Sequence, residues 1–207
     1  LPLMNPIDRL SELFSHFPGI GERQAKRFVY FLLLQDQGYL NSLAQTLTEI
    51  KKSIGQCSQC FRYFQVNGKP LCSECAEIKR DDSLLLVVEK DADLESIKKS
   101  GSYNGRYFVL GGLVPIVEKS TPRRVRINEL KNRITQGKED KLLKEIILAF
   151  SLNPQGDHTD TYVRESLNSL LENSGIEISS LGRGLSTGTE LEYSDKDTIK
   201  NALRNRG

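Results

Sequence analysis

The sequence predicts a multi-part α+β protein, and three observations carry this expectation. Residues 6–54 place apolar side chains at helical spacing, all four cysteines fall within residues 55–78, and short apolar runs alternate with helical stretches from Asp81 onward. Such alternation is typical of a parallel sheet that is covered by helices on both faces. We therefore expect four parts with these boundaries: 4–54, 55–78, 81–175 and 176–207.

The stretch FPGIGERQAKR, residues 17–27, predicts a sharp turn between two helices. Pro18 fixes its own φ, and Gly19 and Gly21 can take a positive φ at little cost. The expected helices on either side are IDRLSELFSHF and ERQAKRFVYFLLL, and LNSLAQTLTEIKKSI follows as a third. Their apolar residues recur at the spacing of one helix face.

The second of these helices begins with basic residues directly after the glycine turn. Arg23, Lys26 and Arg27 fall together, opposite the apolar face. A helix start leaves unpaired N–H groups and a positive dipole end, and glycines let a polyanion approach both closely. The pattern therefore favours a polyanion site, and a solvated basic helix face is the alternative.

The composition limits how such a site can work. The 207 residues are 38% hydrophobic and 27% charged, which is ordinary for a globular protein. A net charge of +2 and a pI near 8.3 are weakly basic, so any binding of a polyanion must be local. We see neither an apolar run of membrane-spanning length nor a secretory signal, and we expect a cytoplasmic protein. The basic clusters are Arg23 to Arg27, then Arg123, Arg124 and Arg126, then Lys196 to Arg206.

The cysteines form two CxxC pairs, CSQC and CSEC, and this is the most specific motif in the chain. Two such pairs are the usual way to bring four thiolates to a tetrahedral Zn²⁺. Asn67-Gly68 predicts a two-residue hairpin turn between FRYFQV and KPL, which would bring the pairs together. We therefore predict one zinc ion per chain, with four ligands: Cys57, Cys60, Cys72 and Cys75.

Other roles for these cysteines are less favoured. Disulfides need an oxidising compartment, and a thioredoxin-like pair would use a single CxxC beside a βαβ unit. Because sulfur would fill all four positions around the ion, no site is left open for water or substrate. The expected role of the zinc is structural.

Four apolar runs in the remainder predict strands: 84–88, 107–110 and 145–150, with a weaker fourth at 177–181. The helices expected between them are KDADLESIKKS, NELKNRI and TDTYVRESLNSLLENSG, and DKDTIKNALRNR closes the tail.

Acidic residues follow two of these strands. Glu89 comes directly after the first strand, with Asp93 close behind, and the third strand leads to Asp157 and Asp160. Ligands of open parallel sheets bind beyond the carboxyl ends of strands, where carboxylates can hold Mg²⁺. The alternative is that these acids cap the following helices. We find no Ser/His/Asp or Cys/His arrangement.

Taken in order, these parts resemble the RecR family of bacterial recombination mediators over nearly the whole chain. FPGIGERQAKR is similar to that family's helix-hairpin-helix element, and CSQC with CSEC to its zinc finger. LLLVVEKDADLESI, followed by GRYFVLGG, resembles the opening of its Toprim domain. RGLSTGTELEYSDKDTIKNAL resembles its C-terminal stretch.

The resemblance implies a non-enzymatic DNA-repair factor. Such a factor assembles into a ring-shaped tetramer, binds DNA without sequence preference, and acts with RecO, and in many bacteria RecF. Together they load RecA onto single strands coated by SSB. The resemblance also assigns the DNA-contacting basic pair to Arg23 and Arg27, beside Gly19, Gly21 and Lys26, and the Toprim glutamate to Glu89.

The chain departs from the family pattern at two places near this acidic edge. Gln155-Gly156 stands where the family carries a glutamate before a glycine, and residues 114–119, VPIVEK, replace a Ser-Pro-Leu segment. Both changes argue against a Mg²⁺ ion held by Glu89, Asp93 and Asp157.

Two other functions stay open as alternatives. A Toprim enzyme, such as a nuclease or topoisomerase, needs an Asp-x-Asp pair to hold its catalytic metal. Here Asp157 is followed by His158, Thr159 and Asp160, so that pair is absent at this spacing. A zinc-finger transcription regulator is the other alternative, and DNA binding without sequence preference would argue against it.

Overall fold

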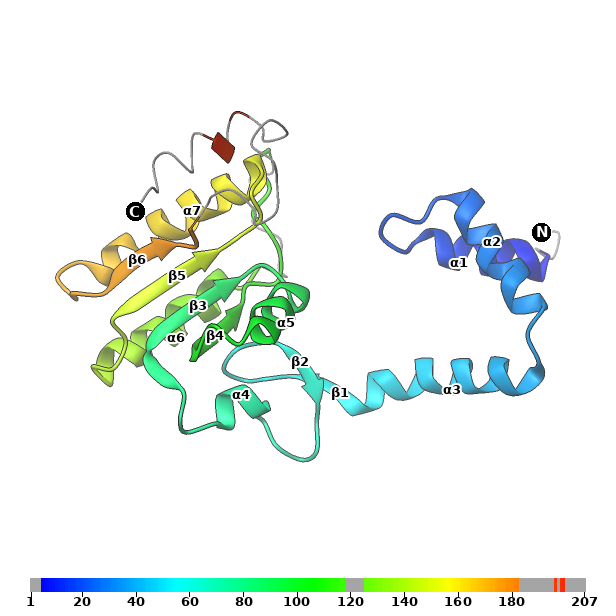
Figure 1. Cartoon of the computed structure of the whole chain (residues 1–207), viewed down its shortest axis with the longest axis horizontal. Coiled ribbons are helices and arrows are strands. Elements are labelled where there is room, and N and C mark those ends of the chain that lie inside the picture. The colour runs from blue at the N-terminus through cyan, green and yellow to red at the C-terminus, as the bar shows by residue number, and fades with distance from the viewer. Residues whose placement is uncertain (1–4, 118–124, 183–195, 197, 200–207) are drawn as a thin grey trace. The chain divides into compact units, whose positions relative to one another are not determined.

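The computed structural model describes residues 5–117, 125–182, 196 and 198–199. The chain divides into two compact units, Leu1–Ile54 and Gly55–Gly207, and each is treated separately below (Figure 1).

The first unit contains three helices: α1 (Pro6–Ser15), α2 (Glu22–Leu33) and α3 (Gln37–Ser53). Asn5 caps α1, since its side chain accepts a hydrogen bond from the Ile7 N–H at 3.0 Å. Asp36 caps α3 in the same way. The three helices confirm the predicted helical region.

Packing in this unit joins α1 to α2. Ala25 and Val29 of α2 are buried. The Phe14 ring meets those of Phe17 and Phe28 edge to face, with centroids 5.7 and 5.8 Å apart. This aromatic cluster lies beside the glycine turn and holds the two helices together.

The second unit contains a four-stranded parallel sheet, as predicted. Its strands are ordered β4-β3-β5-β6. Their bounds are β3 (Asp81–Val88), β4 (Gly105–Val109), β5 (Glu145–Ala149) and β6 (Glu177–Ser180).

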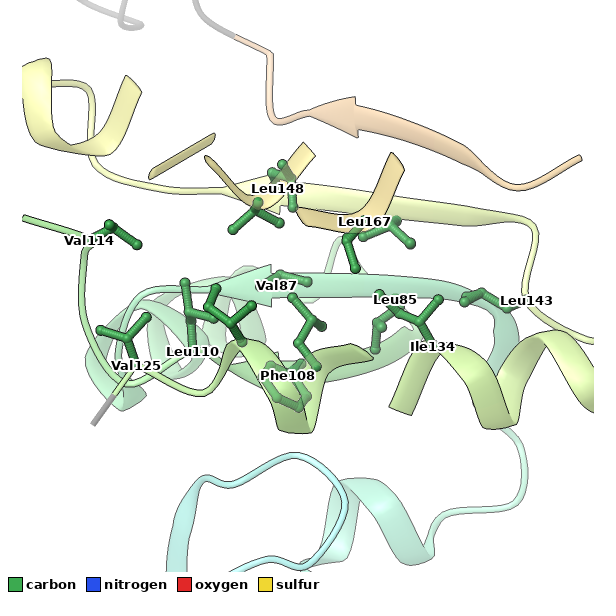
Figure 2. Close-up of a cluster of buried hydrophobic side chains, with 14 residues drawn as sticks. Leu85, Val87, Phe108, Leu110, Val114, Val125, Ile134, Leu143, Leu148 and Leu167 are labelled. Atoms are coloured by element: carbon green, nitrogen blue, oxygen red, sulfur yellow. The ribbon is translucent and has the colours of Figure 1, made fainter. Parts of the chain in front are cut away.

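Helices cover both faces of the central strand β3. They are α5 (Asp91–Ser100), α6 (Ile127–Glu139) and α7 (Pro154–Leu171). Leu85 and Val87 point to the core shared with α6 and α7, while Leu86 and Val88 point to the core shared with α5. Figure 2 shows the first core, where strand, α6 and α7 side chains meet.

Helix α7 begins earlier than predicted. Its cap is Asn153, whose side chain accepts a hydrogen bond from the Gly156 N–H at 2.8 Å, and Pro154 follows as the first helical residue. Proline is well suited to this position because its missing N–H would have no partner there. Asp157 therefore lies inside the helix, and neither it nor Asp160 is the cap.

Gly156 is required by packing, and this leads to a prediction about stability. A Cβ at this position would lie 1.8 Å from the backbone oxygen of Ser151, which cannot move aside as a flexible side chain could. We expect Gly156→Ala to lower the free energy of unfolding by about 3 kcal/mol or more. Thermal or urea unfolding measures this change. Gly182→Ala, where a Cβ meets nothing within 4 Å, is the matched control and should have little effect.

The cysteine segment forms a hairpin region, but its pairing differs from the prediction. Two short strands, β1 (Ile54–Gln56) and β2 (Tyr63–Gln65), pair with each other, and the KPL arm forms no strand. Pro70 explains the difference, since proline has no N–H to donate to a ladder. The short helix α4 (Ser73–Ala76) follows instead.

The C-terminal tail is helical at Lys196, Thr198 and Ile199, which confirms a helix there. The rest of the tail lies outside the described residues, as do Arg123 and Arg124. Among the helices that are described, none combines the length and the apolar character that crossing a membrane requires.

Candidate functional site

The glycine turn joins α1 to α2 through a tight backbone bend. The Ile20 N–H donates to the Phe17 carbonyl at 3.0 Å, and Gly19 has a φ of +76°. Gly21 is the N-cap of α2, with φ −88° and ψ 171°, and has no side chain with which to cap the helix. The N–H groups of the first turn of α2 are thus left without a side-chain cap.

The backbone requires glycine at only one of the two positions in this turn. A Cβ at either position would meet nothing within 4 Å. The positive φ at position 19 favours glycine there, whereas the dihedral angles at position 21 can be adopted by any residue. Glycine is a favourable N-cap residue, but the backbone of Gly21 does not require it. The turn leaves open space in front of a helix N-terminus, which suits the close approach of an anion.

The basic side chains beside this turn are exposed. Arg23 and Arg27 lie one helical turn apart on α2, and the Arg27 Nη1 donates to the Gln24 Oε1 at 3.2 Å. Within the described part of the chain, neither arginine makes an ion pair with a carboxylate. Both charges are therefore available to a ligand.

Lys26 lies in a different environment from the two arginines. It lines a cavity of about 260 Å³ between α1 and the start of α2. Three acidic residues share this lining: Asp8, Glu12 and Glu22. Their charges oppose that of Lys26, so we expect Lys26 to attract a phosphate less strongly than Arg23 or Arg27 does.

The structure brings the four predicted cysteines together. Their sulfur atoms all lie within 4.8 Å of one another, and those of Cys60 and Cys72 are 3.5 Å apart. A tetrahedral zinc site with Zn–S bonds of about 2.3 Å requires S–S separations of about 3.8 Å. Three of the four side chains are buried and Cys75 is partly so. The group is positioned to bind a metal ion.

Local backbone geometry explains how the two pairs meet. The Phe61 N–H donates to the Cys57 carbonyl at 3.0 Å, and the Cys57 N–H to the Arg62 carbonyl at 2.9 Å. Phe61 has a φ of +61°, which closes this turn. In the second pair, the Cys72 N–H donates to the Cys57 sulfur at 3.4 Å, and α4 carries Cys75.

The charges of four adjacent thiols depend strongly on one another. Hydrogen bonding from Cys60 lowers the pKa of Cys57, while hydrogen bonding with Cys57 raises the pKa of Cys60. Thiols this close cannot all hold a negative charge without a cation to balance them. A divalent metal would supply that charge, and a sulfur set of this kind suits zinc.

The predicted acidic residues at the sheet edge do not form such a group. Glu89 accepts a hydrogen bond from the Ser151 hydroxyl at 2.6 Å. Asp93 accepts one from the Lys90 N–H at 3.1 Å, and burial raises the pKa of Asp93. Asp157 lies exposed on α7. Among the residues the structure describes, the cysteine cluster is the one set of three or more ligands close enough to hold an ion.

Sequence reasoning missed an ionic network behind the cysteines. Glu74, from the CSEC motif, is buried and pairs with Arg62 and with Lys98 of α5, the latter at 2.6 Å. Burial favours a higher pKa for Glu74, but hydrogen bonds from Lys98 and Ser73 outweigh it and lower the pKa to about 2. Arg62 also pairs with Glu95. Nothing in the spacing of these residues indicates that they meet.

Comparison with known protein families gives two matches. Residues 83–182 match the model of the Toprim domain, and residues 7–51 match the helix-hairpin-helix model of RecR. The two matches cover the parallel sheet and the three helices of the first unit, respectively.

Curated relatives match over nearly the whole chain. A "Recombination protein RecR" from Cyanothece sp. is 33% identical over 97% of this chain and 95% of its own length. The protein of the same name from Dehalococcoides mccartyi is 34% identical over 97% of this chain and 93% of its own length. That from Lactobacillus acidophilus is 31% identical, over 97% and 96%. On these comparisons and the architecture described above, the chain belongs to the RecR family of recombination proteins.

Proposed function

We propose that this protein is a recombination mediator in DNA repair. It binds the DNA backbone without sequence preference and acts with RecO, and with RecF where that protein exists, to load RecA onto SSB-coated single strands. The observation that supports this most directly is the open glycine turn beside Arg23 and Arg27, in a chain of the RecR family. A protein with this role works in the cytoplasm, at the nucleoid.

The metal at the cysteine cluster is zinc in this proposal, with one ion per chain. Four sulfur ligands at these separations suit a tetrahedral ion and leave no position open for a substrate. The metal stabilises the cysteine segment and takes no part in chemistry.

The protein has no catalytic turnover of its own in this proposal. The Glu89 carboxylate is hydrogen-bonded to Ser151, and Asp93 closes the first turn of α5. After β5 the chain carries Asp157-His158-Thr159-Asp160, and not the Asp-x-Asp spacing of a Toprim enzyme at that position. We therefore propose no Mg²⁺ at this edge.

Helix α3 supports self-association. It buries no residue within its unit, although Leu40, Leu43, Leu47 and Ile50 recur along one helix face. Leu47 and Ile50 are 60% and 53% exposed. A second copy of the chain would cover this stripe, in keeping with the ring-shaped tetramer that we propose from the family resemblance.

A reconstituted loading reaction tests the proposal. RecA filament formation on SSB-coated single strands should show a long lag, which this protein and its RecO partner together shorten, for any DNA sequence. A reaction that is no faster with both proteins than with RecO alone would contradict the mediator role.

The enzyme alternative has its own test. Supercoiled DNA should stay intact when it is incubated with the protein and Mg²⁺. Cleavage or relaxation that vanishes in Glu89→Ala would support the Toprim enzyme instead.

A further inference from the structure

The cysteine segment covers one edge of the sheet. Strand β4 is the edge strand in the order β4-β3-β5-β6, and edge strands present unpaired backbone groups. On its inner side, the chain at the end of β4 pairs with β3, since the Leu110 N–H donates to the Val88 carbonyl at 2.8 Å. The Val109 N–H instead donates to the Cys60 carbonyl, also at 2.8 Å. The first cysteine pair thus satisfies an outward-facing group of β4.

The second cysteine pair is held by the same strand. Arg106 of β4 is only 9% exposed, and its Nη1 donates to the carbonyls of Glu74 and Cys75 at 3.0 and 3.2 Å. Its Nε donates to the Asp82 carboxylate of β3 at 2.7 Å, which fixes the orientation of the guanidinium. One side chain thus joins the sheet to helix α4, which carries Cys75.

Side-chain packing next to these hydrogen bonds also covers the outer edge of β4. The Phe61 ring, directly after Cys60, lies 5.4 Å from the Phe108 ring of β4, centroid to centroid. Arg126 lies 5.5 Å over Phe61, and its Nη1 donates to the Val109 carbonyl at 3.0 Å. Both polar groups of Val109 therefore have partners outside the sheet.

We propose that Arg106 is a positioning residue for the metal site, and that metal binding and closure of the β4 edge are one coupled event. A bound ion fixes Cys60 and Cys75 relative to each other. That geometry presents the Cys60 carbonyl to Val109 and the Cys75 carbonyl to Arg106 at the same time. Without the ion, the Cys60–Val109 and Cys75–Arg106 hydrogen bonds would each have to form independently of the other. Coupling of this kind is reciprocal, so loss of the Arg106 contacts must weaken the hold on the ion.

This inference rests on the structural zinc of the proposed function and is independent of the role in RecA loading. The alternative is a separate zinc module that merely touches the sheet. In that case the metal would be held equally well whether or not Arg106 is present.

Zinc release measures the first half of the coupling. Full-length Arg106→Gln should bind zinc about 10 to 100 times more weakly than wild type, the usual loss for outer residues of metal sites. When loaded with zinc, it should transfer the metal to a chromogenic chelator faster than wild type. Arg80→Gln is the matched control, because the Arg80 Nη1 donates to the Gly105 carbonyl of the same strand and its guanidinium lies over Tyr107. This control should release zinc at the wild-type rate. The rate of zinc release from Arg106→Lys should lie between those of Arg106→Gln and Arg80→Gln.

Hydrogen exchange measures the second half, on the same zinc-loaded proteins. Arg106→Gln should speed exchange of the Val109 amide, which donates a hydrogen bond to the Cys60 carbonyl in the first cysteine pair. The Leu110 amide, which donates to Val88 of β3, should stay protected. Wild-type release rates in Arg106→Gln, or faster release with an unchanged Val109 amide, would overturn the inference. Wild-type protein that binds no zinc would instead contradict the proposed metal.

Discussion

Cys57→Ser is expected to abolish stoichiometric zinc binding and to prevent the native fold of the second unit. Cys57 is fully buried, and its sulfur accepts the Cys72 N–H as well as serving as a predicted ligand. Structural zinc contributes on the order of 10 kcal/mol or more in finger peptides, which is comparable with the whole stability of a typical domain. Because the cysteine pairs are bonded to β4, the loss should extend to the sheet.

This prediction is tested by measuring the zinc content of the purified variant and its unfolding curve. We expect Cys57→Ser to contain no bound zinc and to accumulate in the insoluble fraction, or to unfold without a cooperative transition. Ser58→Ala is the matched control, since Ser58 is exposed in the same turn and is not a ligand. A variant that lacks zinc but unfolds cooperatively at the wild-type temperature would show that the metal does not stabilise the fold.

The sheet and most helices were predictable because their signals are local. Each strand of a covered parallel sheet is a short continuous apolar run, and four such runs became β3 to β6. The strand order was not predictable in the same way. Nothing in the sequence of β3 states that it lies between β4 and β5, because that arrangement depends on the packing of all the helices.

The elements that differed from prediction are those decided by contacts between distant residues. Gly68 takes a positive φ of +73°, but Asn67-Gly68 is not the predicted hairpin turn: β2 pairs with β1 because Pro70 cannot donate to a ladder. Arg106 and Glu74 are 32 positions apart, and no period or motif relates them. The four metal ligands were predictable from the sequence because the ligands of a zinc site follow a recognisable spacing.

The DNA site is the prediction with the largest functional effect. We expect the double variant Arg23→Ala and Arg27→Ala to lose most of its affinity for DNA of any sequence. A chain with a net charge of +2 attracts DNA weakly at long range, so affinity must come from local contacts, which the proposed tetramer would repeat over several subunits. Each phosphate contact that is lost should also flatten the log–log salt dependence by about 0.9 on duplex DNA. Fluorescence anisotropy at several salt concentrations measures both effects.

Two further variants separate phosphate contacts from general charge. Lys26→Ala removes the same charge from the same helix, but Lys26 lies beside Asp8, Glu12 and Glu22. Its effect on affinity and on the salt slope should therefore be smaller than that of Arg23→Ala or Arg27→Ala. Gly21→Ala tests the turn itself. It should change the free energy of unfolding by less than about 1 kcal/mol, since alanine is a poorer N-cap than glycine but fits these dihedral angles and its Cβ meets nothing within 4 Å. It should nevertheless weaken DNA binding by blocking close approach of a phosphate.

The arginines would be only a solvated helix face if the double variant bound DNA as wild type does, with zinc content and oligomer mass unchanged. In that case Gly21→Ala should also be silent, because no phosphate would approach the turn. The DNA contacts would then have to lie elsewhere, and the cluster of Arg123, Arg124 and Arg126 would be the next to test. Agreement between the arginine and glycine variants matters more than either alone. The arginines report on charge, whereas Gly21 reports on the approach of the ligand to the backbone at the start of α2.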